Sequence, residues 1–321
     1  MKITIPHFTI FTFLLFSLNV LGQGGGFIVK DGKTFFPIGS YDLPKEDAKL
    51  TELAAAGFNF IRCNSKEALD RAQSVGMLGW VPLNFAGGVT DDFKSRVNAV
   101  AGHPALAVWE GPDEIVWGFT GGSGLYRDLK VHEKPSAWWE QTPGAVKYAT
   151  ERSATVIPNM IGAVSYVRKV DPDKRQVWIN EACQSDAGYI RQYLDQIDIT
   201  GCDIYPVKNL RDSGPAVRSS VDEIRFYANR FMQIGRNKPV YMVLQGFSWP
   251  ELGGLLGNQP PAYPSFAESR YMAYTAIVHG AKGINYWGMR YSKSEEFLQS
   301  VYAVVSELSA LQPFLTAPVP Q

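Results

Sequence analysis

"HPALAVWEGPDEIVW", residues 103–117, is an apolar run that breaks off at a cluster of acids. A short apolar run that stops before Gly and Pro is typical of a buried strand, so we place the acids at the strand's carboxyl end. They are Glu110, Asp113 and Glu114, with Pro112 between them. Like charges this close raise the pKa of at least one carboxyl, which is what a proton donor at neutral pH requires.

Seven other short apolar segments resemble this one, and longer segments with helical periodicity lie between them. We expect strands at 34–41, 58–64, 78–85, 106–112, 176–182, 198–206, 240–248 and 283–289. We expect helices at 45–57, 65–76, 90–102, 143–170, 187–196, 216–235, 267–281 and 294–312. Such alternation, with strands apolar on both faces, predicts an α/β fold of the (β/α)₈ TIM-barrel type. A doubly wound open sheet is the alternative, but the turn after 34–41 has no GxGxxG pattern.

The 321 residues suit one barrel domain, which we expect over 27–312, with a C-terminal tail at 313–321. Two connections are long, 115–142 after the fourth strand and 249–265 after the seventh. In a barrel both follow the carboxyl ends of strands, where active sites are built, and loops of this length are usually functional.

Residues 1–22 are predicted to be a secretory signal peptide. Lys2 precedes an apolar stretch from Phe8 to Leu21, and Val20 and Gly22 are small enough for a cleavage site. A membrane anchor is the alternative, but the stretch is shorter than the ~20 residues of a span. We therefore expect a secreted or periplasmic protein with no membrane attachment after cleavage.

The balance of charges limits the classes of binding partner, and the cysteine count bears on disulfides and metal sites. Lys plus Arg and Asp plus Glu both total 31, which argues against nucleic acid or an anionic membrane surface. Cys63, Cys183 and Cys202 are an odd number, so at least one thiol stays free; buried thiols and a Cys183–Cys202 bridge both remain open. No metal spacing links them to the scattered histidines, so we expect no metal and no cofactor. His103 and His279 precede strands and are interpreted as structural. The oligomeric state stays open.

Polar and aromatic residues gather at the predicted carboxyl ends of the strands. They are Tyr41, Asp42, Arg62, Asn64, Asn84, Glu110, Asp113, Glu114, Asn180, Glu181, Asp203, Tyr205, Gln245, Trp249, Trp287 and Arg290. Carboxylates and amides suit the hydroxyl edges of sugars, flat aromatic rings suit their C–H faces, and glycosidic cleavage needs a carboxylic acid. A carbohydrate is the expected substrate.

The chain also resembles the (β/α)₈ glycoside hydrolases of clan A. The matching segments are 27–44 (FIVKDGKTFFPIGSYDLP), 55–63 (AAGFNFIRC), 103–114 (HPALAVWEGPDE), 198–206 (DITGCDIYP), 238–249 (KPVYMVLQGFSW) and 276–288 (AIVHGAKGINYWG). The resemblance implies a hydrolase of O-glycosidic bonds in a poly- or oligosaccharide, which the predicted signal peptide would direct to secretion. It makes Glu114 the general acid/base, with Asp113 where these enzymes carry Asn, and it puts Gln245 where they carry a nucleophilic Glu.

An amide cannot act as a carboxylate nucleophile, so three readings stay open. Glu181 or Asp203 replaces the nucleophile; a separation from Glu114 of ~5–5.5 Å suits retention and ~6.5–9.5 Å suits inversion. Alternatively, Asp113 and Glu114 act as in substrate-assisted hexosaminidases, with Asp113 orienting a 2-acetamido group. In the third reading the barrel binds a glycan without cleaving it.

The remaining site residues are assigned to substrate binding: Tyr41, Arg62, Asn84, Glu110, Tyr205, Gln245, Trp249 and Trp287. Trp287 is the preferred sugar-stacking platform. Tyr205 resembles the tyrosine that orients the strand-seven group in these barrels, with a core role as the alternative. Glu110 has a second reading, in which it pairs with Arg62 rather than contacting the sugar.

Overall fold

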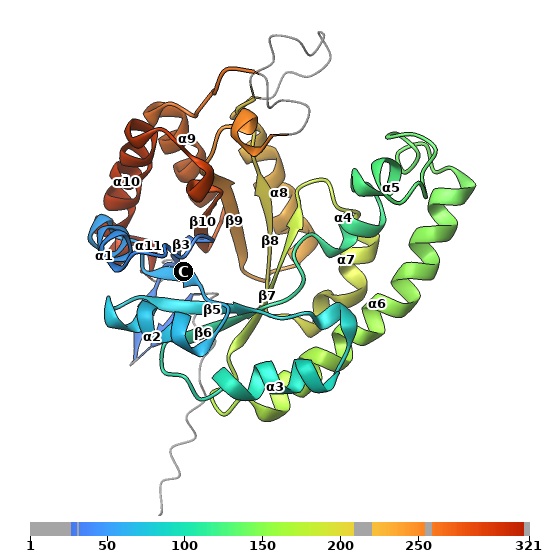
Figure 1. Cartoon of the computed structure of the whole chain (residues 1–321), viewed down its shortest axis with the longest axis horizontal. Helices are drawn as coiled ribbons and strands as arrows, with labels where there is room; N and C mark the ends of the chain where they lie inside the picture. Colours follow the sequence, from blue (N-terminus) through green and yellow to red (C-terminus); the bar gives the residue numbers. More distant parts are fainter. Residues whose placement is uncertain (1–26, 31, 209–219, 254–258, 318–321) are drawn as a thin grey trace, which may run out of the picture.

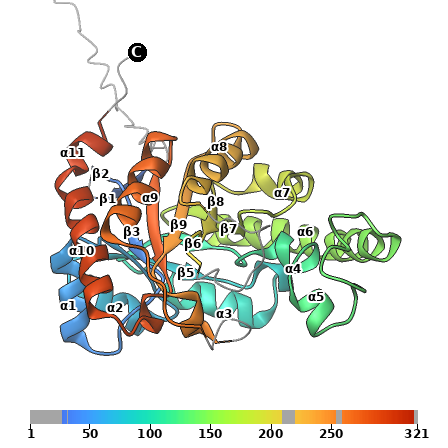
Figure 2. The ribbon, with the colours of Figure 1, turned by 90° about the horizontal axis from the view of Figure 1, so that it is seen from above.

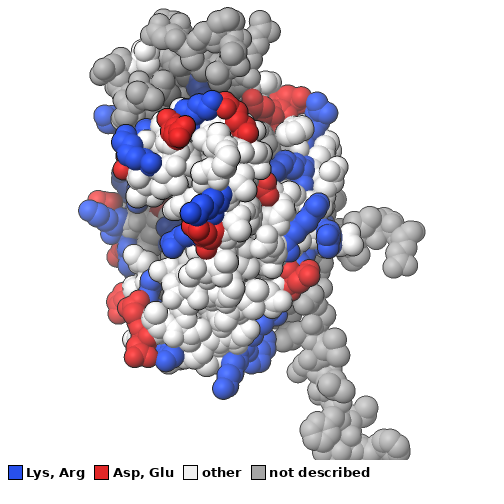
Figure 3. Space-filling view, turned by 90° about the vertical axis from the view of Figure 1, so that its right-hand side faces the viewer, with Lys and Arg blue, Asp and Glu red and all other residues white. Residues whose placement is uncertain are grey.

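The computed structural model describes residues 27–30, 32–208, 220–253 and 259–317. The predicted signal peptide, residues 1–22, lies outside this part of the chain. Among the described residues no helix is both long and apolar enough to cross a bilayer. On the face shown in Figure 3, basic and acidic side chains are interspersed, in keeping with the balanced charge of the sequence.

Eight parallel strands close into a barrel in the order β10-β3-β4-β5-β6-β7-β8-β9. They are β3 (Ile38–Ser40), β4 (Phe60–Arg62), β5 (Leu78–Pro82), β6 (Leu106–Glu110), β7 (Gln176–Ala182), β8 (Ile199–Ile204), β9 (Val240–Gln245) and β10 (Gly283–Trp287). Each falls within a predicted strand segment, so the TIM-barrel prediction is confirmed.

The first predicted strand, 34–41, is divided in the structure. Its beginning joins β2 (Lys33–Phe35), which pairs antiparallel with β1 (Ile28–Lys30) in a separate two-stranded sheet. Its end enters the barrel as β3. Pro37 lies between the two strands, and a residue without an N–H is poorly suited to continuous pairing.

Helices surround the barrel, with α1, α9 and α10 on one side and α6 and α7 on the other (Figure 1). The longer ones are α1 (Asp47–Ala56), α2 (Lys66–Ser74), α3 (Asp91–Val100), α6 (Pro143–Val170), α7 (Ala187–Tyr193), α8 (Glu223–Gly235), α9 (Phe266–Val278) and α10 (Glu295–Ala310). The side chains of Ser65 and Thr90 cap α2 and α3 by accepting backbone N–H bonds, and Gly57 ends α1 with φ 107°. A last short helix, α11 (Gln312–Leu315), lies at the start of the predicted tail.

The two long connections differ from the predicted loops. The segment 115–142 contains two short helices, α4 (Ile115–Phe119) and α5 (Gly124–Arg127). Figure 2 shows both beside α6, on the side of the barrel away from α10. The connection after β9 begins with a 3₁₀ turn, Trp249–Leu252, and residues 254–258 lie outside the described chain.

Two apolar layers stabilise the barrel. The larger packs between strands and helices, while large rings fill the interior, where Trp80 lies 5.8 Å from Trp178 and Trp178 lies 5.4 Å from Tyr241 between ring centroids. Gly201 lets β8 lie close to β9 and to the Trp178 ring, because a Cβ there would lie 2.1 Å from the Tyr241 carbonyl oxygen and 3.2 Å from Trp178 Nε1. The interior residues alternate along each strand, and this alternation decides which side chains reach the mouth of the barrel.

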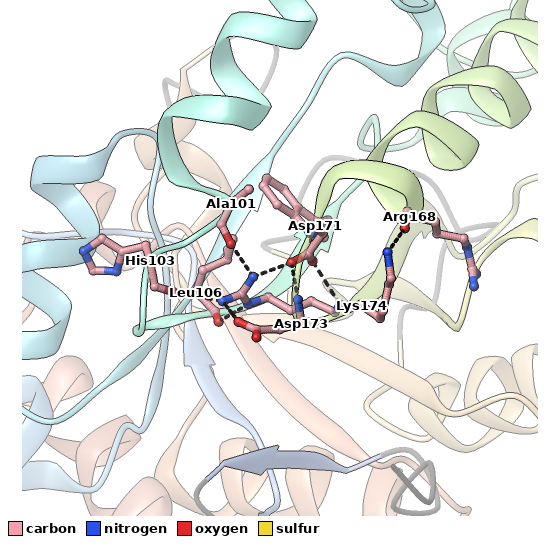
Figure 4. Close-up of polar contacts among 9 residues, drawn as sticks. Ala101, His103, Leu106, Arg168, Asp171, Asp173 and Lys174 are labelled. Carbon is pink, nitrogen blue, oxygen red and sulfur yellow. Dashed lines mark hydrogen bonds and ion pairs between the residues drawn. The ribbon is translucent and has the colours of Figure 1, made fainter. Parts of the chain in front are cut away.

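A charged cluster lies at the opposite, amino-terminal end, outside the barrel, between the starts of β6 and β7 and the end of α6 (Figure 4). Arg175, just before β7, donates from Nε to the Leu106 carbonyl oxygen at 2.7 Å and from its Nη groups to the carbonyls of Ala101 and His103. It also pairs with Asp171, whose carboxylate accepts from the Trp109 indole at 2.7 Å. Arg175 thus ties the start of β6 to the end of α6.

Candidate active site

Each barrel strand delivers one interior-facing residue to the carboxyl-terminal mouth, at or just beyond its end. The residues are Tyr41, Arg62, Pro82, Glu110, Asn180, Asp203, Gln245 and Trp287. Their direction follows from the two-residue repeat, since Phe60, Trp80, Val108, Trp178 and Val243 belong to the interior layer two positions earlier. The mouth therefore combines acids, amides, one guanidinium and aromatic rings.

Glu110 forms an ion pair with Arg62 at the floor of this mouth. Its Oε2 accepts from Arg62 Nε at 2.9 Å, and the Glu110 side chain is fully buried. Burial raises the pKa of Glu110 to about 7, although the Arg62 charge opposes the shift. The arrangement agrees with the reading in which Glu110 pairs with Arg62. The Arg62 guanidinium carbon also lies 5.5 Å from the centroid of the Tyr41 ring.

Asp113 and Glu114 are positioned by the neighbouring strand β7. Asn180 donates from Nδ2 to Asp113 Oδ1 at 2.9 Å, and the Asn180 carbonyl accepts the Glu114 N–H at 3.0 Å. Glu114 adopts a left-handed backbone, φ 48° and ψ 38°, directly before α4. That conformation costs a non-glycine residue roughly 1 kcal/mol or more, and such strain is concentrated at functional sites.

Glu114 and Asp203, the interior acid of β8, interact electrostatically at the mouth. Burial raises the pKa of both carboxyls, and that of Asp203 rises most strongly. The negative charge of Glu114 adds to the rise at Asp203, whose buried Oδ1 has no hydrogen-bond partner among the described residues. Both carboxyls are thus shifted toward the protonated form, and of the two only Glu114 is more than slightly exposed.

Asp113 adds a third acid beside this pair. Its negative charge raises the pKa of both Glu114 and Asp203. Loss of water raises the pKa of Asp113 itself, against the Asn180 hydrogen bond, but its side chain keeps access to solvent, which moderates the rise. Asp113 is thus the most accessible carboxylate of the cluster.

Glu181 is not brought to the cluster. It follows Asn180 on β7 and so points outward, toward the helices, where it is fully buried. It accepts hydrogen bonds from the Val116 N–H, the Ser185 hydroxyl (2.7 Å) and the Tyr193 hydroxyl (2.7 Å). Burial raises its pKa to about 7. In this position Glu181 anchors the start of α4, next to Glu114.

Gln245 is held entirely by backbone groups. Its Oε1 accepts the Val207 N–H at 2.9 Å, while Nε2 donates to the carbonyls of Val207 (2.8 Å) and Phe247 (3.0 Å). The side chain has no exposed surface. These contacts use both the donor and the acceptor of the amide, so Gln245 joins the end of β9 to the segment that follows β8.

Aromatic rings form one wall of the mouth. Tyr205 stacks on Trp287 with centroids 5.5 Å apart, and Trp249 and Phe247 pack edge-on against them. The Trp249 indole donates to the Tyr205 carbonyl at 3.2 Å. Burial and the nearby charge of Asp203 raise the pKa of Tyr205, so the wall lies beside the acids. Phe247 was not assigned to the site from the sequence. It lies two residues after Gln245 within the predicted strand 240–248, so the two-residue repeat of that strand could have placed it on the same face.

Asn84 lies away from the acids and caps a 3₁₀ turn by accepting the Gly87 N–H at 3.2 Å. His103 contacts Asp70 before β6, at the amino-terminal end, as expected. The described residues contain no cluster of His, Cys, Asp and Glu arranged to hold a metal ion.

The three cysteines remain separate thiols, so the Cys183–Cys202 bridge is not formed. Burial raises the pKa of Cys63 and Cys183 to about 12, and Cys202 is also shifted upward. A thiol that stays protonated is a poor nucleophile, which leaves the carboxyls as the reactive groups of the described mouth.

No protein-family model and no curated protein sequence matches the chain. Its fold is similar to solved β-galactosidases from Rahnella sp. R3 (TM-score 0.60, 11% identity, 92% of this chain and 59% of that one) and from psychrophilic Marinomonas ef1 (0.54, 14%, 86% and 60%). The fold is also similar to that of a Bacteroidetes-affiliated cellulase (TM-score 0.50, 12% identity, 91% of this chain and 94% of that one). The chain spans about 60% of the length of these β-galactosidases. The likeness establishes the barrel fold.

Proposed function

We propose that the protein is a glycoside hydrolase in which Glu114, coupled to Asp203, donates a proton to the leaving oxygen of a glycosidic bond. The observation that carries the proposal is the cluster of Asp113, Glu114 and buried Asp203 at the mouth of the barrel, in which burial and like charge raise the pKa of the acids. General acid catalysis requires a carboxyl that is still protonated near neutral pH, and burial with like-charge contact produces that state. The structural similarity to β-galactosidases and a cellulase supports the reaction class.

Each neighbouring group has a role in this proposal. Glu114 is the partly exposed member of the pair and contacts the substrate, while burial beside Asp203 and the charge of Asp113 help to keep Glu114 protonated. Trp287 and Tyr205 provide the surface on which a sugar ring stacks. Asp113, held by Asn180, orients the group at the 2-position of the sugar. The predicted secretion is in keeping with a polysaccharide substrate, and no cofactor is needed.

A substrate-assisted hexosaminidase is the second candidate, and two observations favour it. Gln245 supplies no carboxylate. Glu181 points away from the mouth and is held by Val116, Ser185 and Tyr193. A 2-acetamido group on the substrate would then act as the nucleophile, with Asp113 polarising it.

The test is a panel of aryl glycosides and polysaccharides assayed with the mature protein and with Glu114→Gln. Turnover of at least one substrate, lost in the variant, supports the hydrolase. Activity confined to N-acetylhexosaminides selects the substrate-assisted candidate. No turnover on the whole panel, with glycan binding retained, contradicts both and leaves a glycan-binding barrel.

A further inference from the structure

A cavity of ≈ 580 Å³ adjoins the acidic mouth on the side of β3 and β10. Tyr41 and Arg62 line it, and Arg62 also pairs with Glu110, so the cavity continues directly from the candidate site. Its outer wall is the segment between β3 and α1 together with the turn after β10. A ligand seated at Glu114 therefore has room to extend here.

The charged residues of this cavity differ in sign from those of the mouth. The lining carries Lys45, Lys49, Arg62 and Arg290 against only Asp42 and Glu46. The mouth carries Glu110, Asp113, Glu114 and Asp203. Because Arg62 pairs with Glu110 and Arg290 with Asp42, the excess of cations in the cavity comes from Lys45 and Lys49 against Glu46.

Part of this positive charge is unpaired within the described chain. Arg290 is balanced by Asp42, with Nε and Oδ1 3.4 Å apart. Arg62 uses Nε for Glu110, but neither of its Nη groups donates to another described residue. Lys45 and Lys49 are exposed and make no ion pair with a described residue. These are donors that a bound anion would satisfy.

From this arrangement we infer that the cavity is a subsite for an anionic sugar residue, so that the substrate class is an acidic glycan such as a polyuronate. The inference rests on the proposed glycosidase function. The planar Nη pair of Arg62 matches a carboxylate, and the two lysines add point charges from the rim. The neutral glycosidic bond then lies at Glu114, because the uronate is attracted to the cavity and repelled by Asp113.

Binding of short oligosaccharides tests this inference without requiring turnover. We would titrate the protein, by calorimetry, with trimers of galacturonate and of mannuronate and with their carboxyl-reduced, neutral counterparts. Lys45→Ala/Lys49→Ala removes two cavity charges. Lys33→Ala/Lys169→Ala removes two exposed charges, on β2 and α6, that likewise make no ion pair with a described residue, and is the matched control.

The expected result is tighter binding of at least one acidic trimer than of its neutral counterpart. The cavity variant should lose about fivefold in affinity for the acidic trimer alone, the control variant should lose none, and added salt should weaken only the acidic complex. Equal affinity for both forms, an unaffected cavity variant, or no binding of either acid overturns the inference. Turnover of small neutral aryl glycosides in that case leaves the glycosidase proposal standing, whereas its absence counts against that proposal separately.

Discussion

The Glu114–Asp203 pair depends on neighbours that each have a separate physical effect. Asp113 adds negative charge, Asn180 holds Asp113 and the Glu114 backbone, and Glu181 anchors the helix that begins after Glu114. At the scale of single residues, these effects can be measured one at a time.

Asp113→Asn should move the pH dependence of kcat/KM. The Asp113 charge raises the pKa of Glu114 and Asp203, so its removal lowers both. Activity that requires a proton on the pair is lost as pH rises through the upper pKa. The basic limb of the profile should therefore move to lower pH, by up to about one unit. Asp92→Asn, an exposed acid of α3, is the control. An unmoved basic limb would show that Asp113 does not act on the pair.

Glu181→Gln should change how stability depends on pH. Burial raises the folded-state pKa of Glu181 to about 7 from an ordinary 4.5, so the ionised form is disfavoured in the folded protein. Its contribution to the free energy of unfolding is complete below pH ~4.5 and is lost as pH rises through 7, by at most about 3 kcal/mol. The difference between wild type and variant should shrink over that range in urea unfolding. Exposed Glu296→Gln is the control, and a difference constant with pH contradicts the account.

At the scale of elements, the Gln245 side chain connects the carboxyl end of β9 to the segment that follows β8 through hydrogen bonds to the backbone. Gln245 exchanges two hydrogen bonds with Val207 and adds one to Phe247. Two rings of the aromatic wall belong to the same segments: Tyr205 lies two residues before Val207, and Trp249 lies two residues after Phe247. Gln245 is thus suited to positioning the wall that we assign to sugar stacking.

Gln245→Glu tests whether a carboxylate at this position can act as the catalytic nucleophile. A carboxylate cannot donate the two bonds that Nε2 makes, so the variant should lose about 2–4 kcal/mol of stability and gain no retaining activity. Gln73→Glu on the exposed face of α2 should change neither quantity. Unchanged stability together with new turnover would contradict this account, because Gln245 would then occupy a nucleophile position without a structural role of its own.

The sequence predicts the elements better than it predicts the directions of their side chains. Strand positions follow from apolar runs and turn residues, and each was confirmed within a few residues. Asn180 and Glu181 are neighbours on β7, so only one points inward, yet both faces of that strand are apolar and the periodicity does not tell which. The Gln245–Val207 contact joins segments far apart in sequence, and a strand pattern carries no information about it.

At the scale of the whole molecule, the two ends of the barrel serve different purposes. Acids and aromatic rings occupy the carboxyl-terminal mouth, whereas the Arg175 cluster ties strands to α6 at the amino-terminal end (Figure 4). In this fold the first end is associated with function and the second with stability.

Arg175→Lys should therefore lower the free energy of unfolding and leave kcat/KM unchanged. Lysine keeps the charge but cannot reach the three carbonyls and Asp171 together, so we expect a loss of about 2–4 kcal/mol in urea unfolding. Arg168→Lys, a partly exposed pair with Asp198, should cost less than about 1 kcal/mol. A fall in kcat/KM without a loss of stability would contradict this division between the two ends.

The most direct measurement of the central claim is the dependence of kcat on the leaving group, for wild type and Glu114→Gln, on aryl glycosides whose phenols span a range of pKa. If Glu114 donates the proton, the variant should retain much of its rate with strongly acidic phenols and lose it progressively as the phenol pKa rises, by about 10²-fold or more for the poorest leaving groups. A loss of the same size for every leaving group would contradict Glu114 as the proton donor.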